Sequence, residues 1–181
     1  MVERISALAG QQIPHSFGTN LTLSERRVAH IWQLTAWPDR LPDLAKIAAK
    51  AAGVKKAPGP LQSAFGTASL LRTEPLRWLM VSETELEPLA LGAAGTLLDL
   101  SHARTVIRIE GIEMPALMAR QVPLDLRPSA FPDGSVATTS LDHVAVTLHG
   151  REGGIDLYCM RSFGLAVWEH LIESAGQFAL G

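Results

Sequence analysis

The sequence predicts an α+β fold made of two ferredoxin-like halves. Short strand-like runs interleave with helical patterns and hairpin turns along the chain, which is typical of the α+β class. The order strand–helix–strand–strand occurs twice, as in ferredoxin-like units. The 181 residues match the length of one domain. We therefore expect an N-terminal arm at 1–27 and a single α+β domain at 28–181, with halves at about 28–95 and 96–181.

Residues 1–27 show no clear hydrophobic period. Polar and turn-forming residues such as Gln11, Pro14 and Gly18 interrupt the segment, and charges are scattered along it. Terminal segments of this kind are poorly ordered unless other parts of the chain fix them. The pattern therefore predicts an arm that is mobile on its own.

The first half is expected to have the order β-α-β-β-α. A strand at 28–36 stops at Trp37-Pro38, and a helix at 41–52 has one apolar face and ends at Gly53. Two short strands are predicted at 68–72 and 77–81. Ser82-Glu83-Thr84-Glu85 matches a capping box, which predicts a second helix reaching Ala94.

The second half is expected to begin with the run 96–102. Residues 104–110 alternate, with Ile107 and Ile109 on one face and Arg108 and Glu110 on the other. A short helix from Pro115 ends near residue 121, and strands follow at 136–141, 144–148 and 155–160. Ser162 is expected to cap a final helix, whose apolar stripe is most simply core packing.

Composition points to a partner protein. The chain is 47% hydrophobic and 19% charged, so it has few polar residues with which to cover its surface. Excess apolar surface commonly meets a partner or a membrane, and no run approaches the roughly 20 apolar residues of a membrane helix. Unusually deep burial in the chain itself stays open as an alternative. Trp32, Trp78 and Trp168 are expected in the core, and Trp37 is expected to be exposed to a partner.

Charge and cysteine content exclude further classes. A net charge of −2 leaves no basic footprint for nucleic acid. The single cysteine, Cys159, lies in an apolar strand-like run and is interpreted as a buried thiol. The N-terminus lacks a basic region followed by an apolar core, so no signal peptide is expected and the predicted location is cytoplasmic.

We find no catalytic, cofactor-binding or metal-ligating residue that the sequence can assign. The six histidines lack helical metal spacing and are interpreted as scattered surface or half-buried side chains. Ser101-His102 lacks the geometry of a nucleophile and base, and Asp142-His143 is expected in a tight turn. Gly92-Ala93-Ala94-Gly95 lies in a helical pattern, so close helix packing explains it better than phosphate binding does. The glycine pair 153–154 is interpreted as a turn.

Several runs, taken in order, resemble a known family. The stretch 98–111, the following short helix, Pro123-Leu124-Asp125-Leu126 and Phe131-Pro132-Asp133-Gly134 resemble the glycine-cleavage T-protein-like fold. Within that superfamily the chain looks like the gamma subunit of heterotetrameric sarcosine oxidase. That similarity extends through 123–128, 139–144 and 156–163. In the first half it includes Trp32, Trp37-Pro38 and the run 75–79, so it covers about residue 27 to the C-terminus.

The resemblance implies the fold of the T-protein's folate-binding domain and a support role. In such complexes the alpha and beta subunits hold FAD, FMN, NAD and the tetrahydrofolate site, and the small delta subunit holds zinc. The complex oxidatively demethylates sarcosine, passes the one-carbon unit to tetrahydrofolate and passes electrons to oxygen. The gamma subunit carries no cofactor in that picture, and no residue here matches a family catalytic motif.

Two hypotheses remain at this point. The first is a non-catalytic structural subunit of a sarcosine-oxidase-type heterotetramer, with alpha, beta and delta subunits as partners. The second is a stand-alone folate-dependent protein of one-carbon, aminomethyl-transfer-like chemistry. Complexes acting on N-methylglutamate or dimethylglycine could use a similar subunit, so the amine itself stays open.

Overall fold

The computed structural model describes residues 5–180, and the side chains as far as residue 178. The chain divides into two compact units. One unit is the continuous segment 27–101, and the other combines the chain before residue 27 with the chain after residue 101. This division differs from the expected boundary near residue 95. It also assigns the segment expected as an arm to a folded unit.

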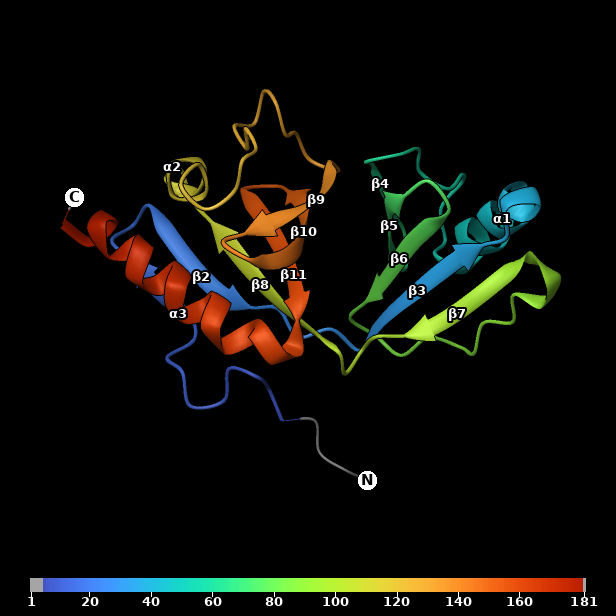
Figure 1. Ribbon diagram of the computed structural model, residues 1–181, viewed down its shortest axis with the longest axis horizontal. Helices are drawn as coiled ribbons and strands as arrows, with labels where there is room; N and C mark the ends of the chain where they lie inside the picture. The colour runs from blue at the N-terminus through green and yellow to red at the C-terminus, as the bar shows by residue number, and fades with distance from the viewer. Residues whose placement is uncertain (1–4, 181) are drawn as a thin grey trace. The chain divides into compact units, whose positions relative to one another are not determined.

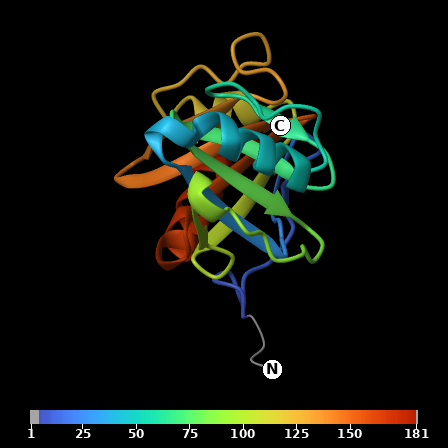
Figure 2. The same cartoon turned by 90° about the vertical axis from the view of Figure 1, so that its right-hand side faces the viewer.

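The unit 27–101 is a five-stranded antiparallel sheet with one helix. Its strands lie in the order β4-β5-β6-β3-β7. Figures 1 and 2 show helix α1 lying across one face of this sheet. The elements are β3 (His30–Ala36), η1 (Pro38–Arg40), α1 (Leu41–Ala51), β4 (Ser63–Phe65), β5 (Ser69–Glu74), β6 (Arg77–Ser82), η2 (Gly92–Ala94) and β7 (Gly95–Asp99).

The core of this unit lies between α1 and the sheet. Leu44 and Ala48 of α1 are buried against the sheet residues Leu34, Leu70 and Trp78. Burial of such apolar side chains stabilises a fold by roughly 1.5–3 kcal/mol each. Helix α1 ends as predicted at Gly53, whose φ of +68° is the left-handed conformation that glycine adopts most easily.

The helix predicted from Ser82 to Ala94 is wrong. Residues 83–91 form an irregular segment, followed only by the short turn η2. The hydroxyl of Ser82, the last residue of β6, binds the backbone of Thr84 in a local turn instead of capping a helix. Pro88 and Gly92 disfavour a continuous helix here, and Leu86 and Leu89 still pack on the core without one.

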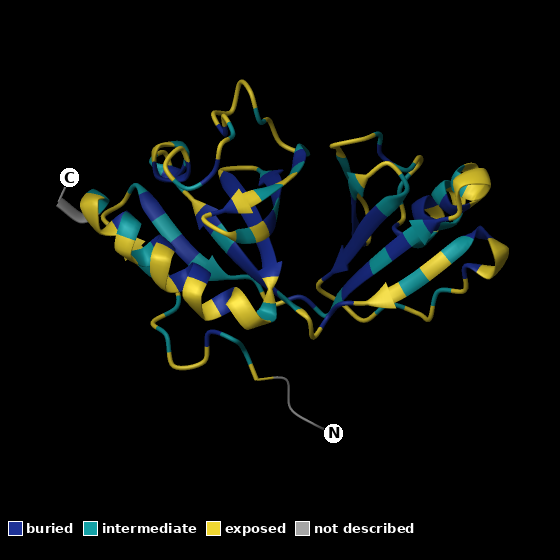
Figure 3. Cartoon of the chain, viewed as in Figure 1, coloured by how far each residue is buried: buried dark blue, intermediate teal, exposed yellow. Residues whose placement is uncertain are grey.

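The second unit is a six-stranded antiparallel sheet in the order β1-β2-β8-β11-β10-β9. Helices α2 and α3 pack on one face of it, and Figure 3 shows buried and exposed residues alternating along α3. The elements are β1 (His15–Phe17), β2 (Leu21–Glu25), β8 (Arg104–Glu110), α2 (Met114–Met118), β9 (Val136–Leu141), β10 (Val144–Arg151), β11 (Gly154–Met160), η3 (Arg161–Phe163), α3 (Gly164–Ala175) and η4 (Gly176–Leu180).

Within residues 5–27 the expected mobile arm contains two strands. Strand β2 pairs with β8 over Thr22–Glu25, and β1 pairs with β2. Leu8, Leu21 and Leu23 are buried in the core of the unit. The turns at Gly10 and Gly18 separate runs too short for a hydrophobic period to appear, and the pairing partner lies some 80 residues away in sequence. The part of the arm at 1–4 lies outside the described residues.

The C-terminal elements follow the predictions with one exception. Strands β9 and β10 form a hairpin in which Leu141 faces Val144, so Asp142 and His143 occupy the tight turn as expected. Val167, Trp168 and Leu171 of α3 are buried in the core. Ser162 does not cap α3: it lies in η3, and Phe163 is the residue that precedes the helix.

The three tryptophans predicted in the core, Trp32, Trp78 and Trp168, are buried, and Trp37 is 50% exposed. Cys159 is buried as predicted. Within residues 5–180, we find no helix with both the length and the apolar character needed to cross a membrane.

Candidate functional site

A row of polar side chains crosses the six-stranded sheet on the face opposite its apolar core. Strand register places Ser24 beside Arg108, Arg108 beside Asp156, and Asp156 beside His149 on four successive strands. Alternation along each strand explains the face, because Leu23, Ile107, Ile109 and Leu157 point into the core on the other side. We call this set, with Arg26 and Arg151, the Asp156 cluster.

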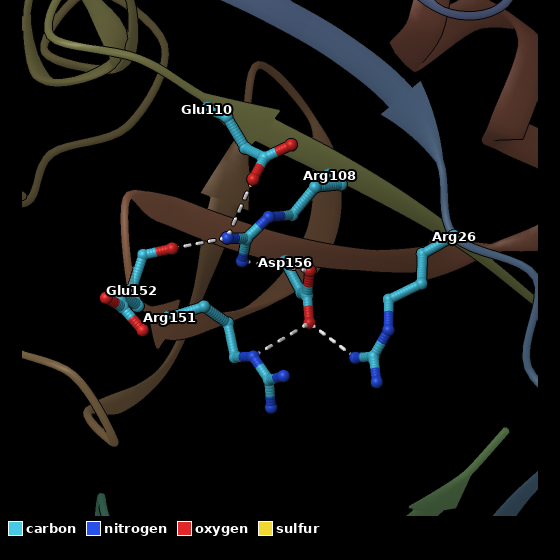
Figure 4. A network of polar contacts seen from close by, with 6 residues as sticks. All are labelled: Arg26, Arg108, Glu110, Arg151, Glu152 and Asp156. Carbon is cyan, nitrogen blue, oxygen red and sulfur yellow. Dashed lines mark hydrogen bonds and ion pairs between the residues drawn. The ribbon is translucent and has the colours of Figure 1, made fainter.

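Asp156 is the centre of the cluster and is fully buried. Its carboxylate accepts a hydrogen bond from Arg26 Nη1 at 2.6 Å and another from Arg108 Nη1 at 3.4 Å, and Arg151 Nε lies 3.9 Å away (Figure 4). Arg108 also donates to the Glu152 carbonyl at 2.6 Å and to Glu110 at 3.1 Å. A buried carboxylate requires such partners, because removing an unpaired charge from water costs several kcal/mol.

A small cleft of about 310 Å³ is lined by Glu25 and by every member of the cluster except His149. The charged residues around the cleft are three arginines, Arg26, Arg108 and Arg151, and two acids, Glu25 and Asp156. The balance of three positive and two negative groups leaves one excess positive charge. The arginine side chains are 15–29% exposed, so water reaches them while Asp156 stays covered.

Three buried titratable groups on β10 and β11 are held in one protonation state near neutral pH. Burial, reinforced by the charges of Arg151, Arg26 and Arg108, lowers the pKa of His149 to about 3. Burial, together with the charge of Asp156, raises the pKa of Tyr158. Burial also raises the pKa of the Cys159 thiol to about 11. A general acid or base works best with a pKa near the operating pH, and a nucleophilic cysteine needs its thiolate. None of these three groups meets that requirement.

The other histidines are separate from this cluster. His30 lies 2.8 Å from Glu85 and tilts against Trp32, while His15 stacks on Phe17. His102 and His143 are exposed in turns, and His170 contacts Gln121. The expectation of surface or half-buried histidines therefore fails at His149, which is fully buried.

The Ser101-His102 pair and the Asp142-His143 pair are local structural features. Ser101 Oγ donates to Asp99 Oδ1 at 2.5 Å and accepts the Ile31 N–H at 3.0 Å, so its hydroxyl joins β7 to β3. His102, its neighbour, is exposed. Asp142 and His143 are both exposed in their turn, with a nitrogen–oxygen distance of 3.4 Å.

In each of the two glycine pairs, the second glycine begins a strand. Gly95 opens β7, where a Cβ atom would come within 2.1 Å of the Thr35 carbonyl. The close packing inferred for the run 92–95 is present, but it is the packing of Gly95 against strand β3. The helix expected there is not formed. Gly153 occupies the β10–β11 turn with φ of +74°, and Gly154 begins β11.

No set of three or more His, Cys, Asp or Glu side chains within the described part of the chain is arranged to hold a metal ion. The sequence alone did not indicate the Asp156 cluster. Alternation placed Arg108 and Glu110 on one face, but Asp156 stood within a run interpreted as apolar. An aspartate inside an otherwise apolar strand is the signal that could have found it.

The arrangement of one six-stranded and one five-stranded antiparallel sheet, each with few helices, defines the class of protein. It is the α+β fold of glycine cleavage system aminomethyltransferase T from Bartonella henselae, with a TM-score of 0.62 and 16% identity. That match covers 84% of this chain and 45% of the enzyme chain.

One similar structure matches almost end to end. It is a chain of the heterotetrameric sarcosine oxidase from Corynebacterium sp. U-96, solved in complex with pyrrole 2-carboxylate. The TM-score is 0.80 at 24% identity, over 97% of this chain and 96% of that chain. The resemblance predicted from the sequence is thereby confirmed for the fold. No protein-family model and no curated protein sequence matches the chain.

Proposed function

We propose that this chain is a non-catalytic structural subunit of a sarcosine-oxidase-type complex. The observation that carries the proposal is the match to a chain of heterotetrameric sarcosine oxidase over nearly the full length of both chains. In contrast, the chain spans less than half of the aminomethyltransferase that shares the fold. The match to nearly the whole oxidase chain therefore favours a subunit of a multisubunit oxidase over an aminomethyltransferase acting alone.

The protonation states in the Asp156 cluster support a structural role. The low pKa of His149 keeps its imidazole neutral near pH 7, and the charge of Asp156 is paired with Arg26 and Arg108. Such a network of paired charges instead ties β2, β8, β10 and β11 together on one face of the sheet.

Exposed apolar side chains support the presence of partners. Trp37, Leu61 and Phe65 are each at least 50% exposed, and all three belong to the unit 27–101. Aromatic residues are enriched at protein interfaces. The proposed partners are the alpha, beta and delta subunits of the complex. We propose that those subunits hold FAD, FMN, NAD, tetrahydrofolate and zinc, and that the assembly is cytoplasmic.

In this proposal the complex oxidatively demethylates sarcosine and passes the one-carbon unit to tetrahydrofolate. The gamma-type chain contributes scaffold and contact surface only. A second candidate, a stand-alone folate-dependent one-carbon protein, is favoured by one observation, the shared fold with the aminomethyltransferase.

Two measurements, one on the co-expressed complex and one on the isolated chain, separate the candidates. The chain is co-expressed with the alpha, beta and delta subunits, and sarcosine-dependent oxygen consumption is measured with and without it. Tetrahydrofolate is titrated into the isolated chain by calorimetry. We expect the assembly to form only with the chain present and the isolated chain to bind no folate. Tight folate binding by the chain alone, with no assembly, would favour the second candidate.

A further inference from the structure

An apolar groove with a basic rim runs beside α1 on the unit 27–101. Its volume is about 670 Å³. Ala45 and Ala49 of α1, Val54 and Ala57 of the following segment, and Trp78 of β6 supply apolar surface to it. These residues belong to one unit and to neighbouring elements, so the groove is a property of this unit by itself.

Every lysine of the chain lines this groove. The sequence contains four lysines, Lys46, Lys50, Lys55 and Lys56, and all four are exposed residues of its lining. Arg72 adds a fifth cation, and none of the described residues that line the groove is acidic. The other arginines of the described chain lie outside the groove. Six of them have a carboxylate within 4 Å: Arg26, Arg40, Arg77, Arg108, Arg127 and Arg151.

The local helix structure explains a cation at only one of these five positions. Lys50 lies in the last turn of α1, where the helix dipole favours a cation. Lys46 lies one turn earlier, and like charges at i and i+4 destabilise a helix by a few tenths of a kcal/mol. Five cations without a carboxylate among them repel one another, so an anionic partner would relieve this repulsion.

One of the five cations is already fixed in place. The Arg72 guanidinium lies over the Trp78 ring, 4.9 Å from its centroid, and donates to the Pro75 carbonyl at 2.5 Å. A side chain that is ordered before binding loses less entropy when it meets a carboxylate. The lysines, in contrast, have long side chains that can adjust to a partner.

We propose that this groove docks an acidic, amphipathic segment of a partner subunit. Apolar side chains of that segment lie on the alanines, Val54 and Trp78, and its carboxylates pair with the lysine rim. Charge complementarity carries the choice of a negatively charged occupant, and the apolar floor requires that the occupant also has an apolar face. The inference rests on the proposed function, because it names the chemistry of the subunit contact.

The position of the lysines makes the test specific. Apart from the α-amino group, reagents that modify amines report on this groove alone. Reductive dimethylation is carried out on the isolated chain and on the purified complex with the alpha, beta and delta subunits, and each lysine is quantified by peptide mass spectrometry. We expect several-fold lower modification of the lysines in the complex. A carbodiimide, which joins amines to carboxylates without a spacer, is expected to link them to Asp or Glu of one partner segment.

Charge variants provide the matched control. Reversing two rim charges with Lys46→Glu and Lys50→Glu is expected to weaken assembly by at least about ten-fold, with a steep dependence on salt. The pair Lys46→Arg and Lys50→Arg keeps the charge and should assemble normally. The pair Arg120→Glu and Arg127→Glu makes the same change in net charge on exposed residues of the other unit, and should also assemble normally.

The outcomes distinguish this inference from the function it rests on. Failure of any complex to form overturns both. A complex that forms while its lysines stay fully reactive, or that tolerates Lys46→Glu and Lys50→Glu, overturns the docking groove alone. Protection that appears only on concentrating the isolated chain, or only with phosphatidylglycerol vesicles, also overturns it, because the occupant is then a second copy or a lipid surface.

Discussion

Asp156 lies on β11 between two neighbouring strands, with Arg108 beside it on β8 and His149 beside it on β10. Its exposed fraction is 0%, and three guanidinium groups surround it. At the residue scale, this buried carboxylate is the shared counter-charge of Arg26, Arg108 and Arg151. Its removal leaves three cations together without their shared counter-charge.

Replacing Asp156 with asparagine keeps the shape of the side chain and removes the charge. We expect the free energy of unfolding to fall by about 2–3 kcal/mol, because the arginines are partly solvated and recover some hydration. Urea denaturation measures this. The control is Asp125→Asn, at an exposed carboxylate whose pKa is lowered to about 2 by hydrogen bonds from Arg127. Equal stability of the two variants would contradict the role given to Asp156.

The buried imidazole of His149 is expected to make the free energy of unfolding depend on pH. Burial lowers its pKa from 6.5 to about 3, so below pH 6.5 the unfolded chain takes up a proton that the folded chain does not. Its stabilising contribution is therefore present above pH 6.5 and is lost as the pH falls toward 3, with a slope of up to about 1.4 kcal/mol per pH unit.

The test compares the wild-type chain with His149→Gln by urea denaturation between pH 7 and 4. The variant should lose stability less steeply as the pH falls, and His143→Gln, at an exposed turn, should follow the wild type. Parallel curves for wild type and His149→Gln would show that the buried imidazole is protonated as easily as a free one.

Most of the Asp156 cluster could not be predicted from sequence patterns. Alternation of apolar and polar residues predicted the face of Arg108, because a strand has a period of two. Asp156 escaped notice because its neighbours Ile155 and Leu157 made the run look uniformly apolar. The contact of Asp156 with Arg26 spans 130 residues, and no local pattern reports a pairing at that separation.

At the scale of elements, α3 offers a test of core packing within one helix. Leu171 is fully buried in the core of the six-stranded unit, while Leu165 on the same helix is 40% exposed. Leu171→Ala should lower the free energy of unfolding by about 2–5 kcal/mol, through lost burial and the cavity left behind. Leu165→Ala should cost far less. Thermal or urea unfolding of both variants checks the packing, and similar losses would contradict the assigned face.

Strand β2 tests the revision of the N-terminal segment. Leu23 is fully buried and lies opposite Ile109 on β8, so Leu23→Ala should also cost about 2–5 kcal/mol. Ile5, which is 65% exposed, is the control, and Ile5→Ala should have little effect. If Leu23→Ala were as harmless as the control, the segment would behave as the mobile arm that the sequence suggested.

The elements that sequence patterns predicted well are those with local signals. Helix α1 has an apolar face of three turns and a glycine stop, and β8 to β11 are long enough for a period to show. The helix predicted at 82–94 failed because Ser82 and Glu85 satisfied a capping pattern although Pro88 and Gly92 followed. Strands β1 and β2 were missed because each is short and gains its stability from pairing with distant residues.

At the scale of the whole molecule, the fold class and the relationship to known structures followed from the order of runs along the chain. The division into units could not be predicted in this way. The chain begins in one unit, forms the whole of the other unit at residues 27–101, and then completes the first unit after residue 101. Each unit has its own apolar core, built from separate sets of residues. The pairing of the segment before residue 27 with the segment after residue 101 could not be predicted from local sequence patterns.

The proposed role of this chain as a subunit, and not as a protein acting alone, can be tested by native mass spectrometry. The chain is tagged, co-expressed with the alpha, beta and delta subunits, and purified through the tag in the presence of tetrahydrofolate. We expect one assembly that contains a copy of each subunit, and a free chain whose mass shows no bound folate. Recovery of the chain by itself, carrying tetrahydrofolate and no partner subunit, would contradict the proposed subunit role.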